Sequence, residues 1–106
     1  MLLSVFDRHR GGEPRHVKRL EIPDDRLSLE VTLSTRLRAG DHVLCVPGDV
    51  IPCDGEIVDG TATVAEPLAA DEPTLAVHIL GSRGVARAGT VVLSDYLVVR
   101  VGDQGR

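Results

Sequence analysis

The chain has 106 residues, of which 42% are hydrophobic and 26% charged, with a net charge of −4. This length predicts a single domain spanning residues 1–106, and the composition is typical of a soluble globular protein. The negative charge argues against a dedicated nucleic-acid binder, because such proteins are usually basic. No apolar run approaches the ~20 residues that cross a bilayer, and the sequence shows no export signal. We therefore expect a cytoplasmic protein without a membrane span.

Short strands separated by turns dominate the predicted structure. In chain order the strand-like segments are Leu2–Phe6, His16–Ile22, Leu27–Ser34, His42–Val46, Glu56–Val58, Thr61–Val64, Leu75–Leu80 and Asp95–Val101. The clearest is Leu27–Ser34, where apolar and polar residues alternate as in a strand with one buried face. Asp59-Gly60 is typical of a tight turn, which predicts a hairpin at that point. No long segment has the 3.6-residue period of a helix, so we expect an all-β sandwich, jelly roll or barrel.

The stretch VPGDVIPCDG, Val46–Gly55, contains two turn signals with the apolar pair Val50-Ile51 between them. Pro47-Gly48 fits a type II turn, because proline fixes φ at the second position and glycine supplies the positive φ of the third. Asp54-Gly55 marks a second corner. We therefore expect a two-cornered connection between strands, which by itself indicates no activity.

The same stretch belongs to a longer pattern. Leu37–Val64, LRAGDHVLCVPGDVIPCDGEIVDGTATV, resembles the pattern GD-x-V-x-V-x-x-GD-x-I-P-x-DG-x-V-x-x-G of the actuator domain of P-type cation-transporting ATPases. The matching positions are Gly40, Asp41, Val43, Gly48, Asp49, Ile51, Pro52, Asp54, Gly55 and Gly60. Ala86–Val101 resembles later strands of that domain, and the pair IPCDG and LSDYLVV is similar to the potassium-transporting branch, the Kdp B subunit. The resemblance is strongest over residues 37–101.

The resemblance implies a small β domain, a distorted jelly roll, whose T-G-E-S loop swings onto a phosphorylated aspartate of another domain. In that family the glutamate of the loop positions the water that hydrolyses the aspartyl phosphate. Counting from Val64, the four loop positions are occupied here by Ala70, Asp71, Glu72 and Pro73. Only the glutamate of the family motif is retained, so the loop is degenerate.

The substituted loop has a physical cost for the chemistry that the resemblance implies. Asp71 places a negative side chain where glycine would let the backbone approach a phosphoryl group. Pro73 lacks an N–H and biases Glu72 toward extended backbone. A general base must sit within ~3 Å of its water, so we expect Glu72 to be poorly held or to be an ordinary solvated carboxylate. Because the sequence also lacks a D-K-T-G phosphorylation motif, we expect no catalysis from the chain alone.

The other candidate residues indicate structure rather than chemistry. Cys45 and Cys53 lie outside any CxxC spacing, and we expect both to be reduced. The four histidines show no metal-ligand spacing, so no metal or other cofactor is expected. A basic cluster without interleaved aromatic residues is predicted to be a solvated face; it comprises Arg8, Arg10, Arg15, Lys18 and Arg19.

The sequence leaves two functions open. The first is an actuator-like domain of a Kdp-type pump, whose partners would be other domains or subunits of a P-type ATPase at the cytoplasmic face of the membrane. The second is a free-standing β domain that acts as a regulatory or protein–protein interaction module. If the 106 residues are the whole gene product, the altered loop favours the second function.

Overall fold

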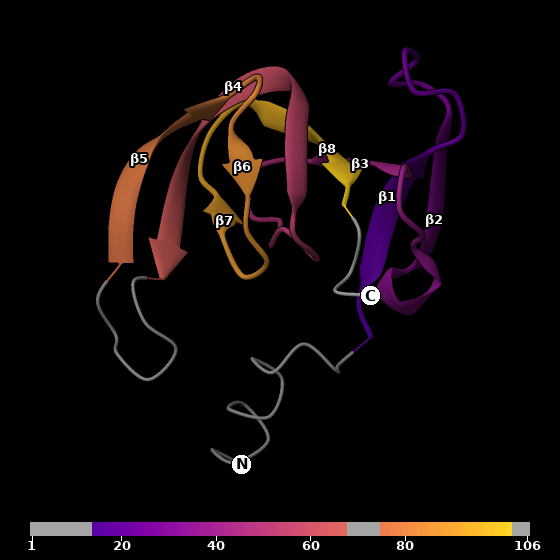
Figure 1. Ribbon diagram of the computed structural model, residues 1–106, viewed down its shortest axis with the longest axis horizontal. Coiled ribbons are helices and arrows are strands. Elements are labelled where there is room, and N and C mark those ends of the chain that lie inside the picture. Colours follow the sequence, from indigo (N-terminus) through magenta and orange to yellow (C-terminus); the bar gives the residue numbers. More distant parts are fainter. Residues whose placement is uncertain (1–13, 68–74, 103–106) are drawn as a thin grey trace.

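The computed structural model describes residues 14–67 and 75–102, and within them it is built almost entirely of antiparallel strands (Figure 1). The elements are β1 (His16–Leu20), β2 (Leu29–Leu33), the 3-10 turn η1 (Ser34–Arg36), β3 (His42–Cys45), β4 (Gly55–Pro67), β5 (Leu75–Gly81), β6 (Val85–Ala86), β7 (Val91–Val92) and β8 (Tyr96–Val101). The predicted all-β fold is confirmed. No helix among the described residues is long and apolar enough to cross a membrane. The predicted strand Leu2–Phe6 lies outside the described residues.

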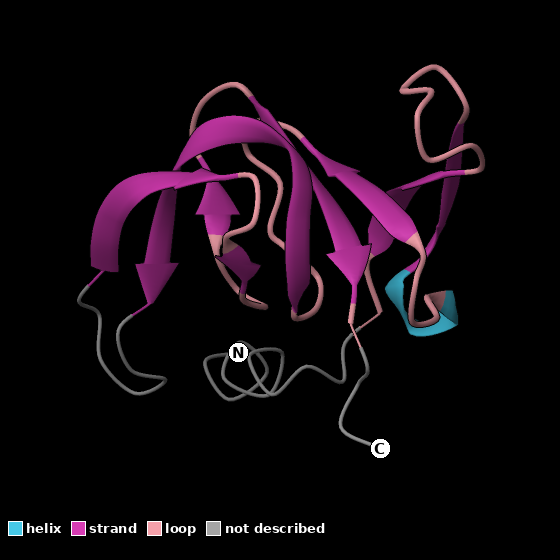
Figure 2. Ribbon diagram, turned by 45° about the horizontal axis from the view of Figure 1, so that its top comes forward, coloured by secondary structure: helices cyan, strands magenta, loops and turns pink. Residues whose placement is uncertain are grey.

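The strands form one strongly curved sheet in the order β2-β1-β3-β8-β4-β5. The two short strands β6 and β7 also pair with β4, and they lie within the arch that the sheet forms (Figures 1 and 2). This curvature lets the sheet enclose a single core, as in a distorted jelly roll. The core is rich in β-branched side chains, which pack well on a pleated surface. Its largest fully buried members are Ile51, Ile57, Leu97, Val43, Val64, Val92, Val98, Val99 and Val101.

The predicted hairpin at Asp59-Gly60 is wrong. Strand β4 continues through these two residues without reversing. Its register against β8 shifts between Ile57 and Asp59, which leaves Val58 as an extra residue. Gly60 does have a positive φ of +91°. A positive φ suits a β-bulge as well as a hairpin turn. The chain therefore bends at this point instead of reversing, and β4 continues from β8 toward β5 (Figure 1).

The first corner of the Val46–Gly55 connection is confirmed. The Asp49 N–H donates a 2.8 Å hydrogen bond to the Val46 carbonyl, and Gly48 has φ +94°, as a type II turn requires. The crossing that follows is held by two backbone bonds of Ile51, which has 0% exposure. Its N–H donates to the carbonyl of Thr90 at 2.8 Å, and its carbonyl accepts from the N–H of Gly89 at 2.9 Å.

The second corner differs in its physical basis. Gly55 is not among the positive-φ glycines; it begins β4, where a Cβ atom would collide with the carbonyl oxygen of Arg100. The neighbouring Asp54 carboxylate accepts the N–H of Ala88 at 2.9 Å. Glycine is therefore needed here for close backbone approach rather than for a left-handed turn.

The alternating strand near residue 30 forms as predicted, but its apolar face is not buried. Leu29 is 44% exposed and Val31 is 66% exposed on β2, and Leu27 just before the strand is 92% exposed. Strand β2 lies at an edge of the sheet and pairs with β1 alone among the described strands. Alternation predicted the strand correctly, but burial depends on a second layer that the described residues do not provide.

Candidate functional site

The loop predicted to match T-G-E-S connects β4 to β5. Pro67 is the last residue of β4, Leu75 is the first residue of β5, and the two are paired across the strands. The structure therefore locates both ends of the connection. Ala70, Asp71, Glu72 and Pro73 themselves lie outside the described residues.

A charged cluster stands beside this connection. One carboxylate oxygen of Glu66 on β4 lies 2.9 Å from Nε2 of His78 on β5, and the other lies 3.1 Å from Nε of Arg87 in the turn before β7. The side chains of Glu66 and His78 share a face of the sheet as diagonal neighbours, because Glu66 is opposite Ala76. This cluster ties β4, β5 and the turn before β7 together at the base of the connection. Ion pairs this exposed contribute about 0–1 kcal/mol, so they orient the strands more than they stabilise the fold.

Sequence reasoning did not find the Glu66 cluster. His78 is one of the four histidines without metal-ligand spacing, and it lies on the edge strand β5. Its partner depends on the register between β4 and β5. A short turn of known type between the two strands would have fixed their register and so predicted the pair. The seven residues between Pro67 and Leu75 do not fix a register.

The basic cluster near the N-terminus does not form one surface in its described part. Lys18 and Arg19 are consecutive in β1, so they point to opposite faces. The Nζ of Lys18 lies 2.7 Å from a carboxylate oxygen of Asp49. Arg19 contacts Glu30 at 2.6 Å and Asp41 at 3.5 Å. These cations are therefore held in ion pairs, while Arg8 and Arg10 lie outside the described residues.

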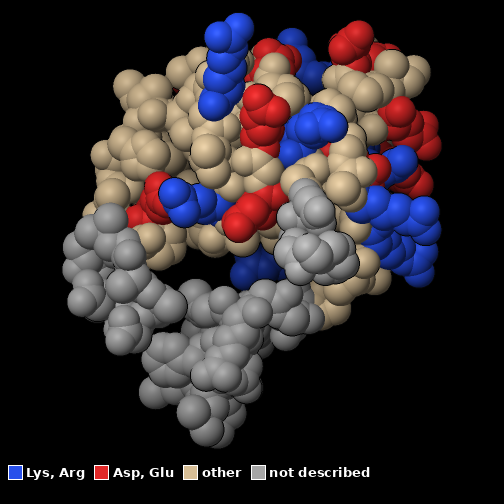
Figure 3. All heavy atoms as spheres, viewed as in Figure 1, with Lys and Arg blue, Asp and Glu red and all other residues tan. Residues whose placement is uncertain are grey.

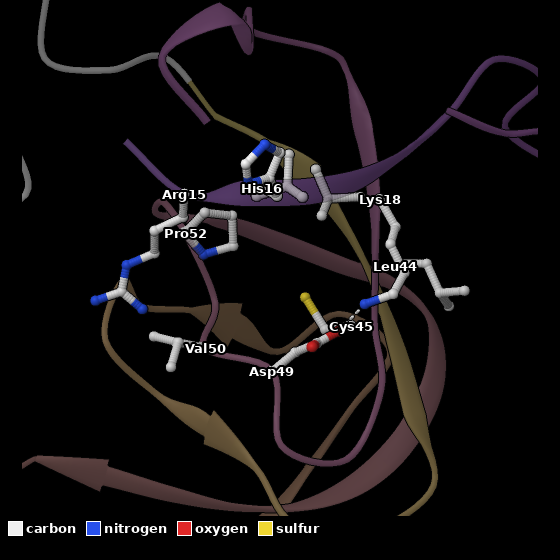
Figure 4. A pocket seen from close by; sticks show the side chains of 10 residues that line it. Arg15, His16, Lys18, Leu44, Cys45, Asp49, Val50 and Pro52 are labelled. Atoms are coloured by element: carbon white, nitrogen blue, oxygen red, sulfur yellow. Dashed lines mark hydrogen bonds and ion pairs between the residues drawn. The ribbon is translucent and has the colours of Figure 1, made fainter. Parts of the chain in front are cut away.

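A cavity of about 120 Å³ lies between β1 and the connection that follows β3 (Figure 4). The Lys18–Asp49 ion pair lies at its wall, together with Arg15, Cys45 and Val50. Asp49 also accepts the N–H of Val46 at 3.0 Å, so its carboxylate fastens the type II turn to β1. Within residues 14–67 and 75–102 there is no group of three or more histidine, cysteine, aspartate or glutamate side chains that could hold a metal ion. The contacts of Asp49 at the cavity wall therefore hold the type II turn against β1.

Both cysteines are free in the structure, and their surroundings make them poor nucleophiles. Burial raises the pKa of the Cys45 thiol from 9.0 to about 12, and the nearby carboxylate of Asp49 adds to the effect. Burial also raises the pKa of Cys53 to about 11, with a smaller contribution from Asp54. Since the thiolate is the reactive form, neither residue is suited to nucleophilic or redox chemistry at neutral pH.

We expect Cys45 in the folded protein to react with iodoacetamide at pH 8 about 1,000-fold more slowly than an unperturbed thiol, because the thiolate fraction falls tenfold per pKa unit. Cys53 should react faster than Cys45, and both should react fully in denaturant. The raised pKa values also mean that the unfolded thiols ionise first, so unfolding should become easier as the pH rises above about 9. Peptide mass spectrometry after timed alkylation measures the rates. Rapid labelling of folded Cys45, or a quantitative disulfide, would contradict this description.

Comparison with known proteins agrees with the fold and the sequence pattern. A sequence model of the P-type ATPase actuator domain matches residues 13–106. The potassium-transporting ATPase ATP-binding subunit of Mesorhizobium japonicum is 39% identical over 79 residues, which cover 74% of this chain and 11% of that protein. The subunit of the same name from Rhizobium meliloti is 37% identical over 97 residues, which cover 91% of this chain and 14% of that protein. The similarity to the potassium-transporting branch is thereby confirmed.

The chain spans only about a tenth of the length of these curated relatives. The crystal structure of a zinc-transporting PIB-type ATPase in the E2.Pi state matches with a TM-score of 0.71 at 19% identity, over 96% of this chain and 15% of that one. At this identity the match supports the fold alone. Together with the family match and the potassium-pump relatives, it leads to one conclusion: this chain belongs to the family of P-type ATPase actuator domains.

Proposed function

We propose that the chain acts as the actuator domain of a potassium-transporting, Kdp B-like P-type ATPase, and that it is catalytically silent on its own. Family membership and the similarity to potassium-transporting subunits support the first part. One observation supports the second: the positions that match T-G-E-S are occupied by Ala70, Asp71, Glu72 and Pro73.

The proposed silence follows from the charge and backbone of those four residues. An aspartyl phosphate carries negative charge on its oxygens, and Asp71 adds a carboxylate beside the glutamate that should orient water. At an effective dielectric constant of 20, two unit charges ~4 Å apart repel by about 4 kcal/mol. Arg87, which contacts Glu66 one residue before the end of β4, is already bound to that carboxylate at 3.1 Å and so offers little compensation.

The proposed partners are the other domains of the same pump, and the proposed location is the cytoplasmic face of the membrane. The β4–β5 connection would be the part of this domain that meets the phosphorylated domain. The cluster of Glu66, His78 and Arg87 would then hold the base of that connection. The domain would contribute movement and contacts to the pump, while the phosphorylated aspartate and the nucleotide site would come from elsewhere.

The free chain should accelerate neither ATP hydrolysis nor the hydrolysis of acetyl phosphate. It should also leave unchanged the dephosphorylation of a potassium pump that lacks its own actuator domain. The measurements are phosphate release and phosphoenzyme decay, with Glu72→Gln as the matched variant. If the unmodified chain accelerates either reaction and Glu72→Gln abolishes the effect, the domain is catalytic and the proposal is wrong.

A further inference from the structure

Within residues 14–67 and 75–102, strand β5 is a sheet edge with no strand on its outer side. It has seven residues, LAVHILG, and among the described strands it pairs with β4 alone. Leu75, Val77 and Ile79 lie on one face of it and are 54%, 64% and 71% exposed. Natural proteins usually protect such an edge with charged residues, proline or a bulge, because its free N–H and C=O groups can pair with another strand. Strand β5 has none of these protections.

The opposite edge of the sheet is different. Strand β2 also exposes apolar side chains, but it includes Glu30, whose carboxylate lies 2.6 Å from Arg19. The surface agrees with this contrast: charged side chains of both signs gather on the right of Figure 3, whereas the region over β5 at the left is largely uncharged. Of the two edges of the sheet, β5 is therefore the one that lacks charged side chains.

We propose that β5 pairs with β5 of a second copy of this chain, antiparallel and about a two-fold axis through His78. This register pairs all seven residues: Leu75 with Gly81, Ala76 with Leu80, and Val77 with Ile79. The exposed apolar row of one copy then meets the same row of the other. The proposal concerns association between copies and does not depend on the proposed function.

Charge favours this partner over others. Strand β5 has no Asp, Glu, Lys or Arg residue, so two copies meet there without the repulsion that a net charge of −4 produces elsewhere. The two His78 rings meet at the axis, and each already has a carboxylate partner 2.9 Å away in its own copy, Glu66. Each of the two His78 rings at the axis therefore has a carboxylate beside it, which offsets the repulsion between the rings when both are protonated.

The interface is small, and this sets its expected strength. A seven-residue strand is about 24 Å long, and one strand edge covers less than the ~800 Å² per partner of a standard stable interface. We therefore expect a reversible dimer that forms at high micromolar concentration. Because the contact is isologous, it closes on itself and should stop at two copies rather than grow into a fibre.

Sedimentation equilibrium of the full chain from ~10 μM to ~1 mM tests the proposal. The unmodified chain should fit a monomer–dimer equilibrium. The double variant V77K/I79K should weaken dimerisation at least tenfold, because the register sets two added lysines of each copy against two of the other. The control is V31K/V85K, which adds the same charge at side chains that are 66% and 61% exposed on β2 and β6. It should dimerise like the unmodified chain.

Hydrogen exchange on the unmodified chain provides a readout that does not depend on how a variant folds. Amide protection in β5 should increase with protein concentration, while protection in β2 should not. Three results would overturn the proposal: a monomer at every concentration, assembly that continues past the dimer, or equal weakening by V77K/I79K and V31K/V85K. Concentration-dependent protection in β2 in place of β5 would overturn it as well.

Discussion

Restoring threonine, glycine and serine at positions 70, 71 and 73 should accelerate dephosphorylation about 10²–10⁴-fold in a potassium pump whose own actuator domain has been replaced by this chain. The change is Ala70→Thr, Asp71→Gly and Pro73→Ser. In the proposed role, the change would remove the carboxylate of Asp71 from the neighbourhood of the phosphoryl oxygens and let the backbone approach them. It also frees Glu72 from the conformational bias of a following proline. The measurement is the decay of radiolabelled phosphoenzyme after a chase with unlabelled ATP.

Two further variants separate the loop chemistry from general effects on the chimera. Glu72→Gln added to the restored loop should return the slow decay, because the carboxylate that orients water is lost. Glu21→Gln, at an exposed residue outside the strands, should leave the restored rate unchanged. A restored loop that decays no faster than the unmodified one, in a chimera that still forms phosphoenzyme, would show that these three residues do not limit the reaction.

Replacing Gly60 with alanine should lower the free energy of unfolding by about 2–6 kcal/mol. Gly60 has φ +91° two residues after the bulge of β4, and a Cβ atom there would collide with the carbonyl oxygen of Tyr96. A left-handed backbone at a non-glycine residue costs ~1–3 kcal/mol, and a forced overlap in a packed region costs ~1–3 kcal/mol more. This is a large share of the ~5–15 kcal/mol that stabilises a typical domain.

Gly89→Ala is the matched control for the Gly60 prediction. Gly89 has nearly the same φ, +92°, but a Cβ atom there would meet nothing within 4 Å. It should therefore cost only the ~1–3 kcal/mol of the left-handed backbone. Urea denaturation followed by circular dichroism measures both variants. Equal losses at the two positions would mean that close approach to Tyr96 is not what requires glycine in β4.

Local patterns predicted the strands near residues 16, 42, 75 and 96 because their apolar residues or flanking turns are local signals. The same signals could not distinguish a bulge from a hairpin at Asp59-Gly60, since both use a glycine with positive φ. Strands β6 and β7 have two residues each, which is too short for any periodicity. Their places depend on pairing with β4, which is a tertiary property.

The candidate site was predictable only in part, for a similar reason. A linear motif pointed to the connection between β4 and β5 as the candidate site, because motif positions are counted along the chain. The cluster of Glu66, His78 and Arg87 depends on strand register and on the turn before β7, which brings residues from three segments together. The exposed row on β5 was also hidden, because the alternation in LAVHIL does not show which strand ends the sheet.

Phosphoenzyme decay in the chimera with the unmodified chain shows whether this domain supports dephosphorylation with its present loop. We expect slow decay, with the same rate after Glu72→Gln, because in the proposed role the glutamate would not orient the attacking water. A chimera that loses its phosphate as fast as the parent pump, and slows by 10²-fold or more after Glu72→Gln, would contradict this expectation.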